Sequence, residues 1–146
     1  MRLDPSDRED AIFGLFDGLV SSIGIVAVLI MSGHPGAIIP AIIGGTLAAS
    51  VGMGAGTWLS TPDRNIGASL ITGGSTAAGG ISLSLPFALV SSRPAAFVCA
   101  GVAALIGITI GALRKRGRRG YIETGIILAA AAVVTISAGV LLGGSA

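Results

Sequence analysis

The chain has 146 residues, of which 52% are hydrophobic and only 11% are charged, and its formal net charge is +2. A soluble domain carries about 25% charged residues, so this chain has too few to cover a surface that faces water. The composition excludes an ordinary soluble protein and predicts an all-α integral membrane protein, whose principal partner is the lipid bilayer.

Five apolar stretches each have close to the roughly 20 residues that a helix needs to cross about 30 Å of hydrocarbon. In chain order they cover residues 11–31, 37–59, 66–90, 94–113 and 121–142. The connections between them are short and leave no room for a soluble catalytic or sensor domain. We therefore predict a single transmembrane domain of five helices over residues 1–146.

The polar segment before the first stretch, MRLDPSDRED, does not fit a cleavable signal peptide, so the first span is expected to stay in the mature protein. Ser6 and Glu9 have the spacing of a capping box, in which each side chain bonds the backbone N–H of the other residue. This spacing predicts that the first helix begins near Asp7.

Basic residues are concentrated on one side of the predicted topology. Alternate connections carry Arg2, Arg8, Arg64 and the run RKRGRR at 114–119, whereas the opposite side carries only Arg93. Cytoplasmic loops are enriched in Lys and Arg, so we expect a cytoplasmic N-terminus and a C-terminus outside. The run is interpreted as a cytoplasmic loop rather than a nucleic-acid site.

Two compositional details complete this picture. Cys99 is the only cysteine, so no disulfide can form within the chain, and it is expected to act as a small packing residue. Arginine greatly outnumbers lysine, and alanine and glycine are abundant, which favours a bacterial plasma membrane.

The presence of Asp17 in the first span requires a physical explanation, because this ionisable residue lies about 9 Å into the span at 1.5 Å per residue. An ionised carboxylate at that depth costs several kcal/mol without a partner, a cation or water. Gly14 and Gly18 form a G-x-x-x-G pattern that Ser22 extends, and this stripe of small residues is interpreted as a close-packing face of the helix. Ser21 lies one turn beyond Asp17. Two readings stay open: a carboxylate solvated by headgroups, and a cation or proton site at a helix interface.

The second span ends in GMGAGTWLS, where Met53, Thr57 and Ser60 have the spacing of one helix face. Met53 lies about six residues before the cytoplasmic end of this span, so it should be at a depth similar to that of Asp17. A carboxylate and a thioether at one level could hold a borderline metal such as ferrous iron. Packing is the alternative role for Met53.

These two motifs resemble those of the vacuolar iron transporter family. FDGLVSS at 16–22 is similar to the family signature N-D-G-[ILV]-V-S-T, and GMGAGTWLS at 52–60 resembles S-M-A-x-G-E-Y-x-S. The resemblance implies a homodimer that exports Fe²⁺ or Mn²⁺ as its substrate in a proton-coupled manner, with no permanently bound cofactor. It implies that Asp17 and Met53 are metal ligands, and Ser21 and Thr57 are candidates to line the pathway.

Two departures from the family keep other functions open. Thr57 stands where the family has a glutamate, and the carboxylate-rich insertion after the second span is reduced to STPDRN, in which only Asp63 is acidic. The chain could instead be a transport-inactive accessory subunit on the same scaffold, or a small pore-forming protein. No catalytic motif occurs in the sequence, so an enzyme is not expected.

Other polar residues receive simpler interpretations. Glu123 is expected to pair with the basic run beside it, and His34 is an exposed loop residue. The hydroxyl residues of the third span could line a path, or they could bond carbonyls of their own helix: Ser69, Thr72, Ser75 and Thr76.

Overall fold

A computed structural model of the chain describes residues 4–60, 65–90, 92–114 and 117–143, and this part of the chain is helical without any strand. The elements in chain order are α1 (Pro5–Met31), the 3-10 turn η1 (Pro35–Ala37), α2 (Ile38–Ser60), α3 (Ile66–Ser82), α4 (Leu85–Leu89), α5 (Ser92–Leu113) and α6 (Arg118–Gly143). Four stretches of these described residues are long and apolar enough to cross a membrane: those of α1, of η1 with α2, of α5 and of α6. They correspond to four of the five predicted spans.

The third predicted span, 66–90, is divided into two helices rather than formed as one. Helix α3 has 17 residues, and the chain turns at Leu83 and Ser84 before α4 begins. Pro86 has no N–H to donate to the carbonyl of Ser82, and its ring would clash with that carbonyl in a continuous helix. The backbone N–H groups of Leu83 and Ser84 instead donate to carbonyls three residues back, at 3.1 and 2.9 Å. α3 alone is thus somewhat shorter than a full membrane span.

The capping-box prediction for the start of α1 is wrong. Asp4 is the N-cap residue, its carbonyl accepts the Arg8 N–H at 3.1 Å, and no side chain caps the helix. Pro5 occupies the first helical turn, where its fixed φ suits the helix and its missing N–H would have had no partner. The helix therefore begins before Ser6, and this serine cannot act as the cap.

The other end of α1 closes with a Schellman motif. The Gly33 N–H donates to the carbonyl of Ile30 at 3.2 Å, and the His34 N–H donates to that of Leu29 at 2.9 Å. Gly33 has a φ of 75°, a conformation that glycine adopts without a steric cost. This turn reverses the chain into η1 and α2.

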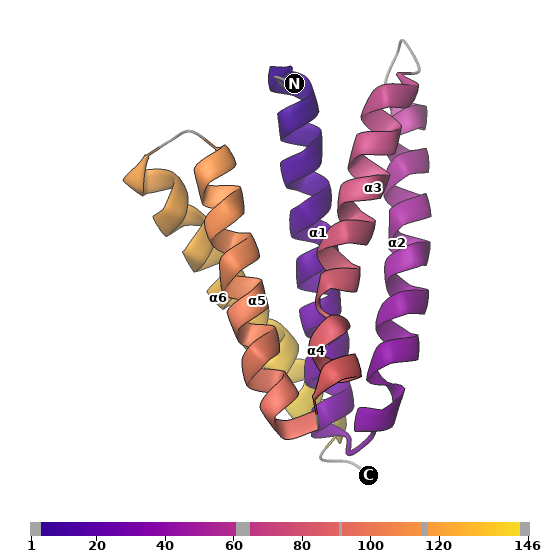
Figure 1. Cartoon of the computed structure of the whole chain (residues 1–146), viewed down its shortest axis with the longest axis vertical. Helices are drawn as coiled ribbons and strands as arrows, with labels where there is room; N and C mark the ends of the chain where they lie inside the picture. The colour runs from indigo at the N-terminus through magenta and orange to yellow at the C-terminus, as the bar shows by residue number, and fades with distance from the viewer. Residues whose placement is uncertain (1–3, 61–64, 91, 115–116, 144–146) are drawn as a thin grey trace.

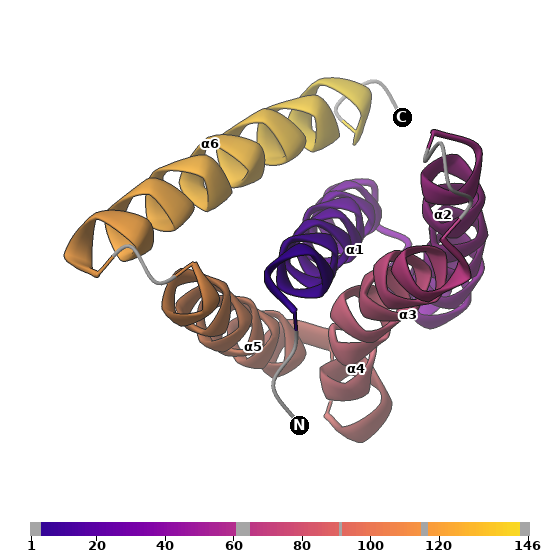
Figure 2. The same ribbon diagram turned by 90° about the horizontal axis from the view of Figure 1, so that it is seen from above.

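Helix α1 occupies the middle of the bundle. It packs against α2 and α3 on one side and against α5 and α6 on the other (Figure 2). The start of α1, the end of α2 and the start of α6 all lie at one end of the bundle, the upper end in Figure 1, whereas α6 ends at the opposite end. We call the end that holds the start of α1 the basic end, after its described arginines Arg8, Arg114, Arg118 and Arg119. Five described acidic residues lie at the same end: Asp4, Asp7, Glu9, Asp10 and Glu123. Arg64, Lys115 and Arg116 lie outside the described residues.

The side chains that face outward are largely apolar. A buried cluster, which includes Leu19, Ile42 and Leu83, lies around α1. Large apolar residues are nevertheless exposed on every long helix: Phe13, Leu47, Leu70, Leu105 and Val134. An apolar exterior of this extent is unlike that of a soluble monomer and is compatible with an integral membrane protein.

Candidate functional site

The helix that carries Asp17 is held against α3 by glycines. A methyl group at Gly14 would overlap the Thr72 carbonyl oxygen, and one at Gly18 would overlap the Thr76 carbonyl oxygen. The backbones of α1 and α3 are therefore in direct contact along this face. The predicted close-packing role of the G-x-x-x-G pattern is confirmed.

A pair of hydroxyl groups sets the register of α1 against α2. Ser22 Oγ and Thr46 Oγ1 are 3.4 Å apart, and both residues are almost completely buried. Helix α2 is in turn tied to α3, because the Ser50 hydroxyl donates to the Gly73 carbonyl at 2.6 Å. Helices α1, α2 and α3 thus form one unit with a defined vertical alignment.

This register supports the predicted depth match between Asp17 and Met53. Asp17 lies five residues before Ser22 on α1, and Met53 lies seven residues after Thr46 on the antiparallel α2. The difference of two residues corresponds to about 3 Å along the helix axes. A carboxylate and a thioether are therefore at nearly the same level on neighbouring helices.

Asp17 lies on a different side of α1 from the glycines that pack against α3. Gly18 faces α3, and Asp17, one residue earlier, is about 100° around the helix from it. Asp17 is partly buried, Ser21 on the same stripe is exposed, and no hydrogen bond or ion pair joins the Asp17 carboxylate to another described residue. The carboxylate thus lies at the edge of the α1–α3 contact, beside a face of α1 that the fold leaves open.

On α2, Met53 and Thr57 are both partly buried and lie one turn apart. The Thr57 hydroxyl donates to the Met53 carbonyl at 2.9 Å. These two residues share a face, as their spacing predicted. The structure brings them to the depth of Asp17 but describes no bond between Asp17 and either residue.

The third-span hydroxyls bond to their own helix. Thr72 donates to the Ala68 carbonyl and Thr76 donates to the Thr72 carbonyl, each at 2.9 Å. Ser69 and Ser75 likewise donate to carbonyls of Asn65 and Thr72. Of the two readings of these residues, the bonds favour satisfaction of helix carbonyls over a polar path.

The remaining polar predictions can now be placed. The Glu123 carboxylate forms ion pairs with Arg114 and Arg119, each at 2.9 Å, which confirms the predicted pairing with the basic run. His34 is exposed, and Cys99 is buried among apolar side chains, as expected. Asp63 lies outside the described residues.

The described residues contain no group of three or more His, Cys, Asp or Glu side chains that could hold a metal ion. One copy of the chain therefore offers Asp17 and Met53 at this level. Divalent transition metals usually take four to six ligands, so one copy supplies only part of a coordination shell.

Sequence reasoning missed the partner of Ser22. Ser22 was recognisable because it continues the small-residue stripe of Gly14 and Gly18 at four-residue spacing. Thr46 gave no such signal, since its role depends on the register of α2 against α1.

Comparison with known proteins finds no relative of this chain. No family model matches the chain, and neither a curated protein nor a solved structure matches it. The resemblance to the vacuolar iron transporters therefore stays a prediction that rests on the motifs around Asp17 and Met53.

Proposed function

We propose that the chain is an integral membrane protein of a bacterial plasma membrane that exports a divalent metal ion, Fe²⁺ or Mn²⁺, from the cytosol. The observation that carries this proposal is the Asp17 carboxylate on an apolar helix, level with the Met53 thioether. Asp17 would bind the metal or exchange protons, and Met53 would act as a soft ligand.

The surroundings of Asp17 support a role that involves a cation. Retaining an ionised carboxylate at this depth costs free energy unless a cation or water compensates it. The carboxylate has no ion-pair partner among the described residues. Ser21 and Thr57 carry hydroxyl oxygens near this level and would line the route of the ion.

A homodimer would complete the coordination shell. Phe13, Asp17 and Ser21 form one stripe along α1 at four-residue spacing, and Phe13 is 61% exposed. A two-fold axis beside this stripe would bring the same surface of a second copy against it. Two carboxylates and two thioethers would then be available to one ion.

The second candidate is a transport-inactive accessory subunit on the same scaffold. The lack of a His, Cys, Asp or Glu cluster among the described residues favours it, as does Thr57 in place of the family glutamate. In that case Asp17 would serve assembly, and its substitution would lower stability without any effect on metal movement.

The test is Fe²⁺ and Mn²⁺ flux in proteoliposomes that contain either the wild type or Asp17→Asn. We expect flux in the wild type and at least a tenfold loss in Asp17→Asn, because the amide cannot supply the negative charge. Glu9→Gln is the matched control, since it removes an exposed carboxylate from the same helix and should leave flux unchanged. Equal flux in wild type and Asp17→Asn, or no flux in either, would reject transport at this site.

A further inference from the structure

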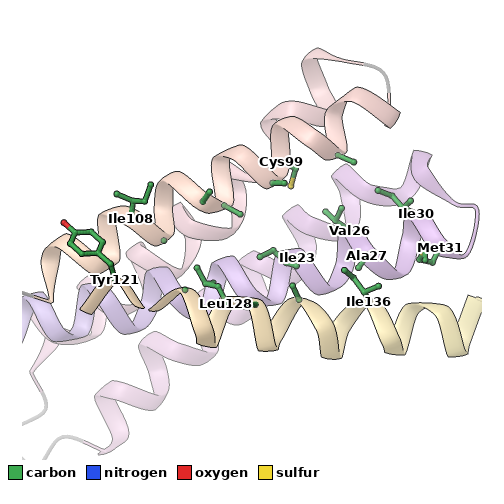
Figure 3. A pocket seen from close by; sticks show the side chains of 18 residues that line it. Ile23, Val26, Ala27, Ile30, Met31, Cys99, Ile108, Tyr121, Leu128 and Ile136 are labelled. Carbon is green, nitrogen blue, oxygen red and sulfur yellow. The ribbon is translucent and has the colours of Figure 1, made fainter. Parts of the chain in front are cut away.

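A deep apolar groove lies between α5 and α6, with α1 as its floor (Figure 3). Its volume is about 690 Å³, within the range of about 300–1,000 Å³ that is typical of small-molecule sites. Ile23 and Val26 contribute the floor, Cys99 and Ile108 one wall, and Leu128 the other wall. Almost all of the lining side chains are apolar, so the groove suits a hydrocarbon chain.

Small residues keep the groove open. Helices α5 and α6 meet near the basic end, where the Tyr121 ring lies against Gly111, and they diverge beyond it with α1 between them (Figure 2). The walls there are built largely from alanine, including Ala100 and Ala104 on α5 and Ala129 on α6. Within the described part of the chain, no larger side chain fills the space that the separation creates.

Along α6 the groove is about as long as one leaflet of a bilayer is thick, and on α1 its lining continues to Ile30 and Met31 at the far end of the bundle (Figure 3). On α6 the lining runs from Tyr121 to Ile136, and these positions lie fifteen steps apart, about 22 Å at 1.5 Å per residue. Half of a bilayer with its headgroup region is about 20–22 Å thick. A lipid whose headgroup lies at the basic end would place its acyl chain along this line.

One arginine is positioned for a headgroup at that end. Arg118 precedes the lining residues Gly125 and Ala129 by seven and eleven positions, a spacing that puts all three on one face of α6. Its side chain is exposed and forms no ion pair with a described residue. Arg114 and Arg119, in contrast, are paired with Glu123.

We propose that this groove holds an acyl chain of an anionic phospholipid, whose phosphate is bound by Arg118 and by the hydroxyl group of Tyr121. Basic pockets between membrane helices bind anionic headgroups, and tyrosine is enriched at the level where lipid headgroups lie. Arg118, a cation without an ion pair to any described residue, lies at the end of an apolar groove and complements a lipid with one negative charge. The inference rests on the proposed membrane location and not on metal transport.

The experiment is native mass spectrometry of the detergent-purified chain, titrated with phosphatidylglycerol or with phosphatidylcholine of the same acyl chains. We expect the wild type to bind one phosphatidylglycerol roughly fivefold more tightly than phosphatidylcholine, the preference that one arginine near a headgroup provides. Arg118→Gln should abolish this preference, whereas Arg119→Gln should keep it, because Arg119 faces away and pairs with Glu123.

A second pair of variants tests the groove itself. Ala129→Phe would fill the groove and should reduce the binding of both lipids at least tenfold. Ala130→Phe adds the same ring to the next residue, which is exposed and does not line the groove, so its lipid binding should equal that of wild type. Circular dichroism checks that each variant keeps its helix content.

Three results would overturn the proposal. The first is equal affinity of the wild type for the two lipids, and the second is equal lipid binding by Ala129→Phe and Ala130→Phe. The third is a dimer in wild type that Ala129→Phe converts to a monomer with unchanged lipid binding, since the groove would then be an interface between copies. Failure of metal flux would leave all three lipid measurements unaffected.

Discussion

At the scale of single residues, Gly18 determines how closely α1 and α3 can pack. The position that a Cβ would occupy there overlaps the Thr76 carbonyl oxygen and lies 2.9 Å from the Gly80 backbone nitrogen. Both neighbours are backbone atoms, so they cannot move aside as the end of a flexible side chain could. The α1–α3 contact therefore depends on the absence of a side chain at Gly18.

Gly18→Ala should destabilise the protein by about 1–3 kcal/mol, the usual cost of overpacking a rigid contact. Gly56→Ala is the matched control, because a Cβ at Gly56 meets nothing within 4 Å and alanine favours a helix by about 1 kcal/mol over glycine. Thermal unfolding in detergent measures the difference, with a lower Tm expected for Gly18→Ala only. Equal Tm values for the two variants would contradict the proposed close contact.

Residue-scale prediction from sequence succeeded where a spacing rule applied. The four-residue spacing of Gly14, Gly18 and Ser22 predicted a packing face on α1, and the structure shows it. The start of α1 was wrong by about two residues because Pro5 fixes the first turn more strongly than the Ser6 and Glu9 pair. A capping box and a first-turn proline compete locally, and spacing alone does not rank them.

At the scale of elements, hydropathy located the helices but not the break between α3 and α4. The average over 66–90 is dominated by apolar residues, whereas the break results from one missing N–H at Pro86. The α5–α6 hairpin was more predictable. Glu123 follows closely after the five basic residues of 114–119, so an ion pair between them was expected, and the structure shows it.

Glu123→Gln should loosen the α5–α6 hairpin. The substitution removes the ion pairs to Arg114 and Arg119 and leaves the Arg114 guanidinium, which is 25% exposed, without its carboxylate. We expect a loss of about 1 kcal/mol in the free energy of unfolding, and a smaller loss at high salt. Arg118→Gln, which removes an arginine with no described ion pair, should leave the unfolding transition in place. The hairpin account would be contradicted if the two variants unfolded at the same temperature.

At the scale of the whole molecule, four of the five predicted spans agree with long apolar helices of the bundle and the third is divided into α3 and α4, whereas the groove could not be predicted. Its existence depends on the angle at which α5 and α6 separate around α1, which no local pattern of alanines encodes. The same limit applies to the candidate cation site. The sequence predicted Asp17 and Met53 at one depth, but the contacts that align their helices, such as Ser22 with Thr46, are visible only in the structure.

The central claim is that a divalent cation binds at Asp17. The most direct measurement is an anomalous difference map from crystals of the protein soaked in Mn²⁺, with crystals of Asp17→Asn treated in the same way. The account predicts a peak within coordination distance of the Asp17 carboxylate that is absent from the variant. Mn²⁺ bound only elsewhere, or an unchanged peak in Asp17→Asn, would contradict it.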